Sequence, residues 1–260
     1  MTETSAVGSP PRGRGLGADY RRLFTASTVS NLGDGIGVIA YPWLASAVTR
    51  NPLLVALVAV VQRLPWLIFT LPVGVLTDRH DRRTLMVWSD IIRAALTLAV
   101  AFIVLGRRSL PSPDALEDVD AVIETDLGLY TIVLVATLLI GIAEVVHDNS
   151  AQTLMPSRVA PEPLQRANGR LWSAELVANS FAGPPRAAIL VAATFSLPFF
   201  VDAATFAVAA VLVAAIPRRP AAPPSTGNQQ SWRVDAAEGF RWLWNHKLLR
   251  ALAVTLGLLN

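Results

Sequence analysis

The sequence contains no cysteine and carries little charge for its length. Without cysteine there is no disulfide bond, no thiol nucleophile and no thiolate metal ligand. Charged residues make up 16% of the 260 residues and hydrophobic residues 53%, and the mean hydropathy is +0.46. Soluble domains typically have about 25% charged residues. The phosphate loop of ATP-driven proteins and the common hydrolase motifs are also absent. The composition therefore argues against a soluble enzyme, and we expect neither a cofactor nor a metal.

Six long apolar runs dominate the first 216 residues. A helix needs about 20 apolar residues to cross the hydrocarbon core of a bilayer. Backbone groups in lipid must be satisfied internally, which these runs can do only as helices. The runs cover residues 23–48, 53–76, 85–105, 127–146, 171–193 and 197–216. The sequence therefore predicts an all-α membrane protein with six transmembrane helices.

The basic residues are distributed unevenly between the two sides of these runs. Most arginines and lysines outside the runs precede the first run or follow the second, fourth and sixth. Positively charged connectors remain cytoplasmic, so the N-terminus is expected in the cytoplasm and the chain in the cell (plasma or inner) membrane. This pattern of basic charge predicts the lipid bilayer as a partner, and we expect no nucleic acid.

The polar segments outside the six runs suggest a domain organisation. Residues 1–19 are rich in proline, glycine and serine and predict a disordered cytoplasmic tail, followed by the six-helix unit at 20–216. Residues 217–247 read as a cytoplasmic linker, with an amphipathic helix at 231–247. Residues 248–260 would begin a seventh transmembrane helix that is too short to cross the bilayer. We therefore expect a fragment of a longer protein, or a truncated product.

The connector between the second and third runs reads Gly-Val-Leu-Thr-Asp-Arg-His-Asp-Arg-Arg at residues 74–83. It resembles the signature loop of the major facilitator superfamily, Gly-x-Leu-x-Asp-Arg-x-Gly-Arg-Arg/Lys, with Asp81 in place of the second glycine. The resemblance implies that the six runs form the N-terminal half of a twelve-span transporter, with a second six-helix half to follow. The matching loop residues are Gly74, Asp78, Arg79, Arg82 and Arg83. They are expected to act as a charged latch between helical bundles; the alternative is that the arginines only set the topology.

Other segments resemble the drug:proton antiporter branch of this superfamily, which contains macrolide and enterobactin exporters. They are residues 31–35, 148–156, 166–169 and 202–206. Gly183, Pro184 and Pro185 correspond to a Gly-Pro element that bends the fifth helix, but Arg186 follows where the branch has small residues or Leu-Gly-Gly. The resemblance implies proton-coupled efflux of amphipathic drugs or metabolites by alternating access, with the substrate bound between the two halves.

Charged residues inside the runs are costly in lipid and mark functional positions. At about 1.5 Å per helical residue, Asp34 and Arg63 reach a similar depth near the midplane, which predicts an ion pair. Arg186 and Asp202 fall in the outer third and predict a second pair.

A proton-coupled antiporter needs a carboxylate that is alternately protonated and charged. Burial favours the protonated form of a carboxylic acid, and a nearby cation favours the charged form. Asp34 is our first candidate for this role and Glu175 our second. The alternative is that each makes a structural ion pair or a hydrogen bond between helices. Glu144, His147 and Asp148 are metal-ligand types, but they match a packing motif of the family and we expect no metal there.

Three aromatic residues are candidates for the wall of a substrate cavity. Tyr41, Trp66 and Phe69 would suit an apolar or aromatic small molecule, and the alternative is anchoring at lipid or at the membrane interface. The expected partners are therefore a small-molecule substrate, protons, lipid and the missing C-terminal half. Two other functions stay open: a narrow-specificity metabolite or siderophore carrier, including an uptake carrier, and a non-transporting remnant or partner subunit.

Overall fold

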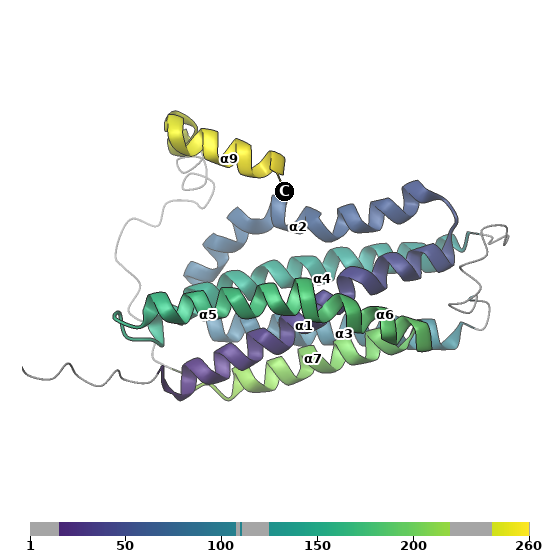
Figure 1. Ribbon diagram of the computed structural model, residues 1–260, viewed down its shortest axis with the longest axis horizontal. Helices are drawn as coiled ribbons and strands as arrows, with labels where there is room; N and C mark the ends of the chain where they lie inside the picture. The colour runs from purple at the N-terminus through teal and green to yellow at the C-terminus, as the bar shows by residue number, and fades with distance from the viewer. Residues whose placement is uncertain (1–15, 108–109, 111–124, 219–240, 260) are drawn as a thin grey trace, which may run out of the picture.

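The computed structural model describes residues 16–107, 110, 125–218 and 241–259, and all the regular secondary structure in these ranges is helical. The long helices lie side by side along the longest axis of the molecule (Figure 1). In chain order they are α1 (Gly17–Val48), α2 (Pro52–Arg79), α3 (Arg82–Gly106), α4 (Leu127–Leu154), η2 (Met155–Ser157), α5 (Leu164–Leu176), η3 (Val177–Ala182), α6 (Gly183–Ala193), α7 (Leu197–Ala214) and α9 (Lys247–Leu259). The predicted all-α membrane bundle is confirmed. Most of the predicted tail at residues 1–19 and of the predicted amphipathic helix at residues 231–247 lies outside the described residues.

Five stretches are long and apolar enough to cross a membrane. They are Pro52–Arg79, Arg82–Gly106, Leu127–Ser157, Leu164–Ala193 and Leu197–Ala214. The first run differs, because α1 has 32 residues but carries Ser27, Ser30, Asn31 and Asp34 within it. The first three of these are buried and the Asp34 side chain is 8% exposed. The polar groups of α1 therefore face other helices and not lipid, which explains why this helix is less apolar than its neighbours.

Asx side chains set the starts of three helices after short connectors. Asn51 accepts a hydrogen bond from the Leu53 backbone, and Asp126 accepts one from the Leu129 backbone at 2.9 Å. Asp81 caps α3 in the same way, since its Oδ1 accepts from the Arg83 N–H at 3.3 Å. The aspartate that replaces the second glycine of the signature loop thus has a local structural role as an N-cap.

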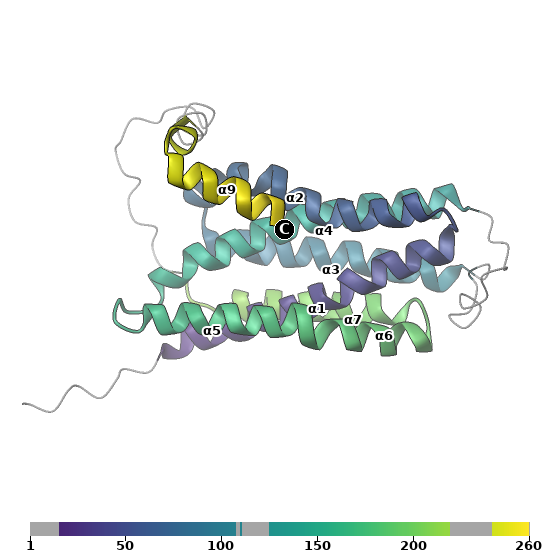
Figure 2. The same ribbon diagram turned by 45° about the horizontal axis from the view of Figure 1, so that its top comes forward.

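Packing of the bundle places α1 at its centre. α1 packs against α7, η3 and α6, while α3 packs against α4 and α7, and α2 against α4. α5, η3 and α6 follow one another as one continuous rod (Figure 2). Large apolar side chains such as Leu67, Ile189 and Val211 point outward with more than half of their surface exposed, as expected of a bundle that faces lipid.

The buried interior is layered along the helices. One apolar cluster contains Leu44, Val133 and Phe199, and a second contains Leu23 and Met86 at the other end of the same helices. Between the two clusters, α1, α3, α4 and α7 contribute buried polar residues. These are Ser27, Ser30, Asn31, Ser89, Asp90, Arg93, Thr97, His147, Ser150 and Asp202. This polar layer is the place in the described chain where buried polar chemistry is concentrated.

Candidate functional site

Arg93 occupies the centre of the polar layer and is fully buried. Its guanidinium donates a hydrogen bond to Asp34 of α1 and another to Ser30 Oγ at 3.0 Å. Asp90, one turn earlier on α3, lies 3.5 Å from the same guanidinium. The Arg93 guanidinium also sits 3.9 Å from the centre of the Phe206 ring on α7. One cation therefore serves two carboxylates and an aromatic face, an arrangement that suits the planar guanidinium.

His147 extends this group to α4. Its Nδ1 atom lies 3.0 Å from Asp90 Oδ1, and both side chains are fully buried. We call Asp34, Asp90, Arg93 and His147 the charged cluster. It joins α1, α3 and α4 by ionic contacts in a region where charge is costly to bury unless it is paired.

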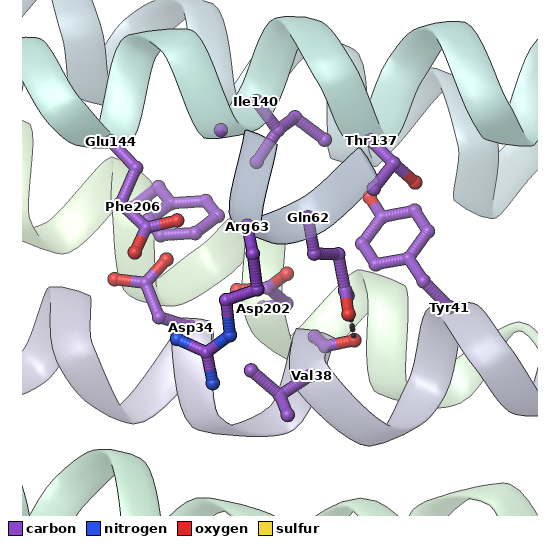
Figure 3. A pocket seen from close by; sticks show the side chains of 12 residues that line it. Asp34, Val38, Tyr41, Gln62, Arg63, Thr137, Ile140, Glu144, Asp202 and Phe206 are labelled. Carbon is purple, nitrogen blue, oxygen red and sulfur yellow. Dashed lines mark hydrogen bonds between the residues drawn. The ribbon is translucent and has the colours of Figure 1, made fainter. Parts of the chain in front are cut away.

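A small cavity opens beside the charged cluster, between α1, α2, α4 and α7 (Figure 3). Its volume is about 50 Å³, which has room for a few water molecules. Three acids from different helices line it, namely Asp34, Glu144 and Asp202. Gln62 of α2 crosses one side of the cavity and donates to the Gly37 carbonyl at 3.1 Å. The cavity is far smaller than the several hundred Å³ of typical ligand sites, so it can hold water and ions but not a drug-sized molecule.

The predicted pair of Asp34 with Arg63 is corrected by this geometry. Asp34 is paired with Arg93, while Arg63 is an exposed residue that borders the same cavity. Counting residues along the helices gives the depth of Asp34 and Arg63 but not the helix face on which each side chain lies. The face of α3 that meets α1 carries Arg93, and that packing face decides the partner.

The predicted pair of Arg186 with Asp202 is not formed either. Arg186 is exposed and donates to the Ala182 carbonyl of its own turn at 2.7 Å. Asp202 is 2% exposed and faces α1 across the cavity, and its Oδ1 has no hydrogen-bond partner among the described residues. The two residues share a depth but lie on different helix faces. Arg186 consequently does not disturb the interior, although it replaces a small residue of the exporter pattern.

Glu175, the second carboxylate proposed for proton coupling, lies on α5 and is half-buried. It is not among the residues that line the cavity. Glu144 does line the cavity and accepts a hydrogen bond from the Trp66 indole at 3.4 Å. The structure therefore brings Asp34 together with Glu144 and Asp202, and it leaves Glu175 outside this group.

The predicted aromatic wall divides into separate positions. Tyr41 lines the cavity but is buried, with its ring edge against Phe199 at a centroid distance of 4.9 Å. Trp66 is partly exposed on α2, one turn after Gln62, and Phe69 is half-buried on the same helix outside the cavity lining. Of the three, Tyr41 alone contacts both the cavity and the apolar core.

The segment around Gly183, Pro184 and Pro185 is irregular immediately before the glycine. Residues Val177–Ala182 form a π-helix, and the α-helix resumes at Gly183. A Cβ atom built on Gly183 would lie 2.5 Å from the Gly35 backbone, so the two helices touch through glycine at both sides. Asn179 in the π-helix donates to Asn31 Oδ1 at 2.9 Å. The Gly-Pro element thus lies where α1 comes into close backbone contact with the rod formed by α5, η3 and α6.

The signature loop has contacts within this bundle. Arg83 donates its Nε to the Ile216 carbonyl at 2.6 Å and also bonds the Ala214 carbonyl, which satisfies the C-terminal end of α7. Arg82 lies 3.7 Å from the exposed Asp78. Arg79 is exposed at the end of α2, and no described residue comes within 4 Å of a Cβ atom built on Gly74. Arg83 therefore fastens α3 to α7, whereas Gly74 packs closely against no helix of the described bundle.

Sequence reasoning missed the charged cluster as a unit. It identified Asp34 as important but did not connect it with Asp90 and Arg93, and it considered His147 only with its neighbours in the chain. The available signal was Asp90 and Arg93, which are three residues apart and so share a face of an otherwise apolar helix.

Comparison with known proteins agrees with the motifs. The Major Facilitator Superfamily profile matches residues 23–260. The multidrug efflux pump Tap of Mycobacterium tuberculosis (strain ATCC 25618 / H37Rv) is 25% identical over 247 residues, covering 94% of this chain and 55% of the pump. The multidrug efflux pump Tap of Mycolicibacterium fortuitum is 26% identical over 236 residues, covering 89% of this chain and 53% of the pump. No solved structure matches the chain.

The chain thus spans about half the length of these curated relatives. The match extends over the whole six-helix bundle, including the signature loop and the charged cluster. This chain belongs to the major facilitator superfamily of membrane transporters.

Proposed function

We propose that this chain forms the N-terminal half of a secondary active transporter that exports amphipathic small molecules in exchange for protons. The observation that carries the proposal is the position of Asp34, which is ion-paired to buried Arg93 on one side and faces the small cavity on the other. A carboxylate in this position can be reached by water and protons through the cavity, while its charge is stabilised by a fixed cation.

Protonation of Asp34 would change the contacts between helices. The Asp34–Arg93 ion pair joins α1 to α3, and a protonated carboxyl group would lose most of this attraction. A binding event at one residue could therefore alter how α1 is held in the bundle, which is what coupling of a proton to a conformational change requires. Alternating access, in which the two halves rock around a central site, is the motion we propose.

The substrate site needs surfaces beyond those of this bundle. The cavity of about 50 Å³ is too small for a drug-sized molecule, and the helices that border it are α1, α2, α4 and α7. Glu144 and Arg63 line the cavity and Trp66 donates a hydrogen bond to Glu144, and we propose that these three side chains meet the substrate. We propose that the second six-helix half completes the site and that the acids favour cationic amphipathic substrates.

The names of the two relatives, both multidrug efflux pumps, support export over uptake. We further propose that the N-terminus lies in the cytoplasm, so that the signature loop faces the cytoplasm as well. The charged latch would then act between the two halves on the cytoplasmic side, where Gly74 leaves room for a helix of the second half.

The test is efflux of a fluorescent cationic dye from cells that express the full-length reading frame, with and without a proton uncoupler. We expect uncoupler-sensitive efflux that falls at least tenfold in Asp34→Asn and is retained in the control Arg186→Gln, whose side chain is exposed outside the cavity. Absence of dye efflux from a well-expressed, membrane-inserted protein would contradict the proposal and favour a narrow metabolite carrier or a non-transporting protein. Efflux at the same rate with and without the uncoupler would contradict the proton coupling.

A further inference from the structure

His147 is a buried titratable residue that the proposed mechanism does not yet use. It lies on α4, its side chain is fully buried, and its Nδ1 lies 3.0 Å from Asp90 Oδ1. Apart from this ionic contact, neither ring nitrogen of His147 makes a hydrogen bond within the described part of the chain. Asp90 is itself shared, because Arg93 approaches the same oxygen at 3.5 Å and Ser30 Oγ lies 3.4 Å away.

The charge balance of the charged cluster depends on one proton. Two carboxylates and one guanidinium leave an excess of one negative charge when His147 is neutral and both acids are ionised. A single bound proton makes the cluster neutral, and a second proton makes it positive. Because net charge is expensive to bury, the state with one proton is favoured over the other two. Asp90 contacts both Arg93 and His147 and is therefore best kept ionised, which leaves the Asp34 carboxylate and the His147 imidazole as the two places for that proton.

We propose that His147 is a second proton-binding residue of this transporter, and that it competes with Asp34 for one proton through the fixed charges of Arg93 and Asp90. The inference rests on the proposed proton coupling and deepens it. With the proton on His147, two ion pairs, Asp34–Arg93 and Asp90–His147, tie α1 and α4 to α3, and the structure places the side chains of both pairs within ion-pair distance. With the proton on Asp34, Asp90 alone balances Arg93 on the same helix, and α1 loses its ionic link to α3.

The charged groups that act on His147 are Asp90 and Arg93 on α3, Asp148 on α4 and Glu175 on α5. Asp34 on α1, Glu144 on α4 and Asp202 on α7 line the neighbouring cavity. All of them except Arg93 are acids, so the surroundings favour a second positive charge in the layer. The contacts decide which residue carries this charge. The His147 imidazole directly contacts Asp90, whereas the Asp34 carboxylate faces the cavity.

The first experiment follows the protonation of His147 without any transport. Histidine-labelled full-length protein in lipid nanodiscs is titrated by NMR, and the His147 signal is identified by its absence in His147→Gln. We expect the midpoint of the His147 titration to fall by ~1 pH unit or more in Asp34→Asn, because the cluster is then neutral without a proton. Ser150→Ala serves as the matched control, since Ser150 is buried on α4 outside the charged cluster. In this variant the midpoint of the His147 titration should not move. If His147→Gln does not fold, the signal is assigned by replacing His80, His246 and the histidines of the second half.

The second experiment measures proton-driven dye transport into proteoliposomes as the pH is varied. In His147→Gln the competition for the proton is removed, so the pH of half-maximal transport should rise by ~1 unit. A purely structural role for His147 would lower the rate at all pH values without moving this midpoint. If the parent protein shows proton-driven transport but the His147 midpoint does not move in Asp34→Asn, the role of His147 is overturned and the proposed coupling stands. If the His147 midpoint moves but the parent protein shows no uncoupler-sensitive efflux, the proposed coupling is overturned.

Discussion

Arg93 is the residue on which the polar layer depends most. It is fully buried, and it is the counter-charge for Asp34 and Asp90 on two different helices. A charged group in lipid is tolerated when its partners are in place, and removal of one partner leaves the others buried and unpaired. The interior of this bundle is therefore stable only as a balanced set of charges.

We expect Arg93→Met to destabilise the folded protein by about 3–5 kcal/mol, because it removes the guanidinium that compensates the buried carboxylates of Asp34 and Asp90. The double variant Arg93→Met, Asp34→Asn should recover part of this loss, since one of the two uncompensated charges is gone. Thermal unfolding of the full-length protein in detergent, followed by size-exclusion chromatography, measures both effects. Arg186→Met is the control, and it should unfold at the temperature of the parent protein. Equal stability of Arg93→Met and the control would show that the cluster does not hold the helices together.

At the scale of elements, α1 makes a close backbone contact with the rod formed by α5, η3 and α6. A Cβ atom on Gly35 would lie 2.7 Å from the Ala178 carbonyl oxygen and 3.0 Å from Asn179 Cα. Both contacts are with the backbone of the π-helix, which cannot move aside as a flexible side chain would. A π-helical turn commonly marks a functional position within a helix, and here it contacts the polar layer through the Asn179–Asn31 hydrogen bond.

Gly35→Ala should therefore push α1 away from the rod formed by α5, η3 and α6 and destabilise the protein by about 1–3 kcal/mol. Gly169→Ala provides the comparison, because a Cβ atom there would meet no described atom within 4 Å and alanine favours the helix. Melting temperatures of the two variants, measured side by side, check this expectation. If Gly35→Ala is as stable as Gly169→Ala, the two helices are not in the close contact described here.

At the scale of the whole molecule, the orientation in the membrane is a proposal that the absence of cysteine makes easy to test. Single cysteines at Leu53 and Glu162, both exposed and at opposite ends of the bundle, should label differently once any cysteine outside these 260 residues has been replaced. With a cytoplasmic N-terminus, a membrane-impermeant maleimide added to intact cells reaches Leu53→Cys but not Glu162→Cys. Permeabilised cells should label both variants and thereby serve as the control. The reversed pattern would place the N-terminus outside.

The sequence by itself determined that this is a helical membrane protein of the major facilitator type. Long apolar runs leave the backbone no alternative to helices in lipid, and the loop at residues 74–83 identifies the family. It also selected Asp34, because a charge in the middle of a span stands out against apolar neighbours. These features are encoded locally, in composition and in short motifs.

Only the tertiary structure decided the partners. Depth along a helix follows from counting residues, but the face that meets a neighbour depends on how all the helices pack together. Asp34 therefore pairs with Arg93 and not with Arg63, and Arg186 stays outside while Asp202 is buried beside the cavity. His147 joins the cluster for the same reason, since α3 and α4 pack with their polar positions at equal depth. Pairing across helices is a property of the packed bundle, and no single helix contains that information.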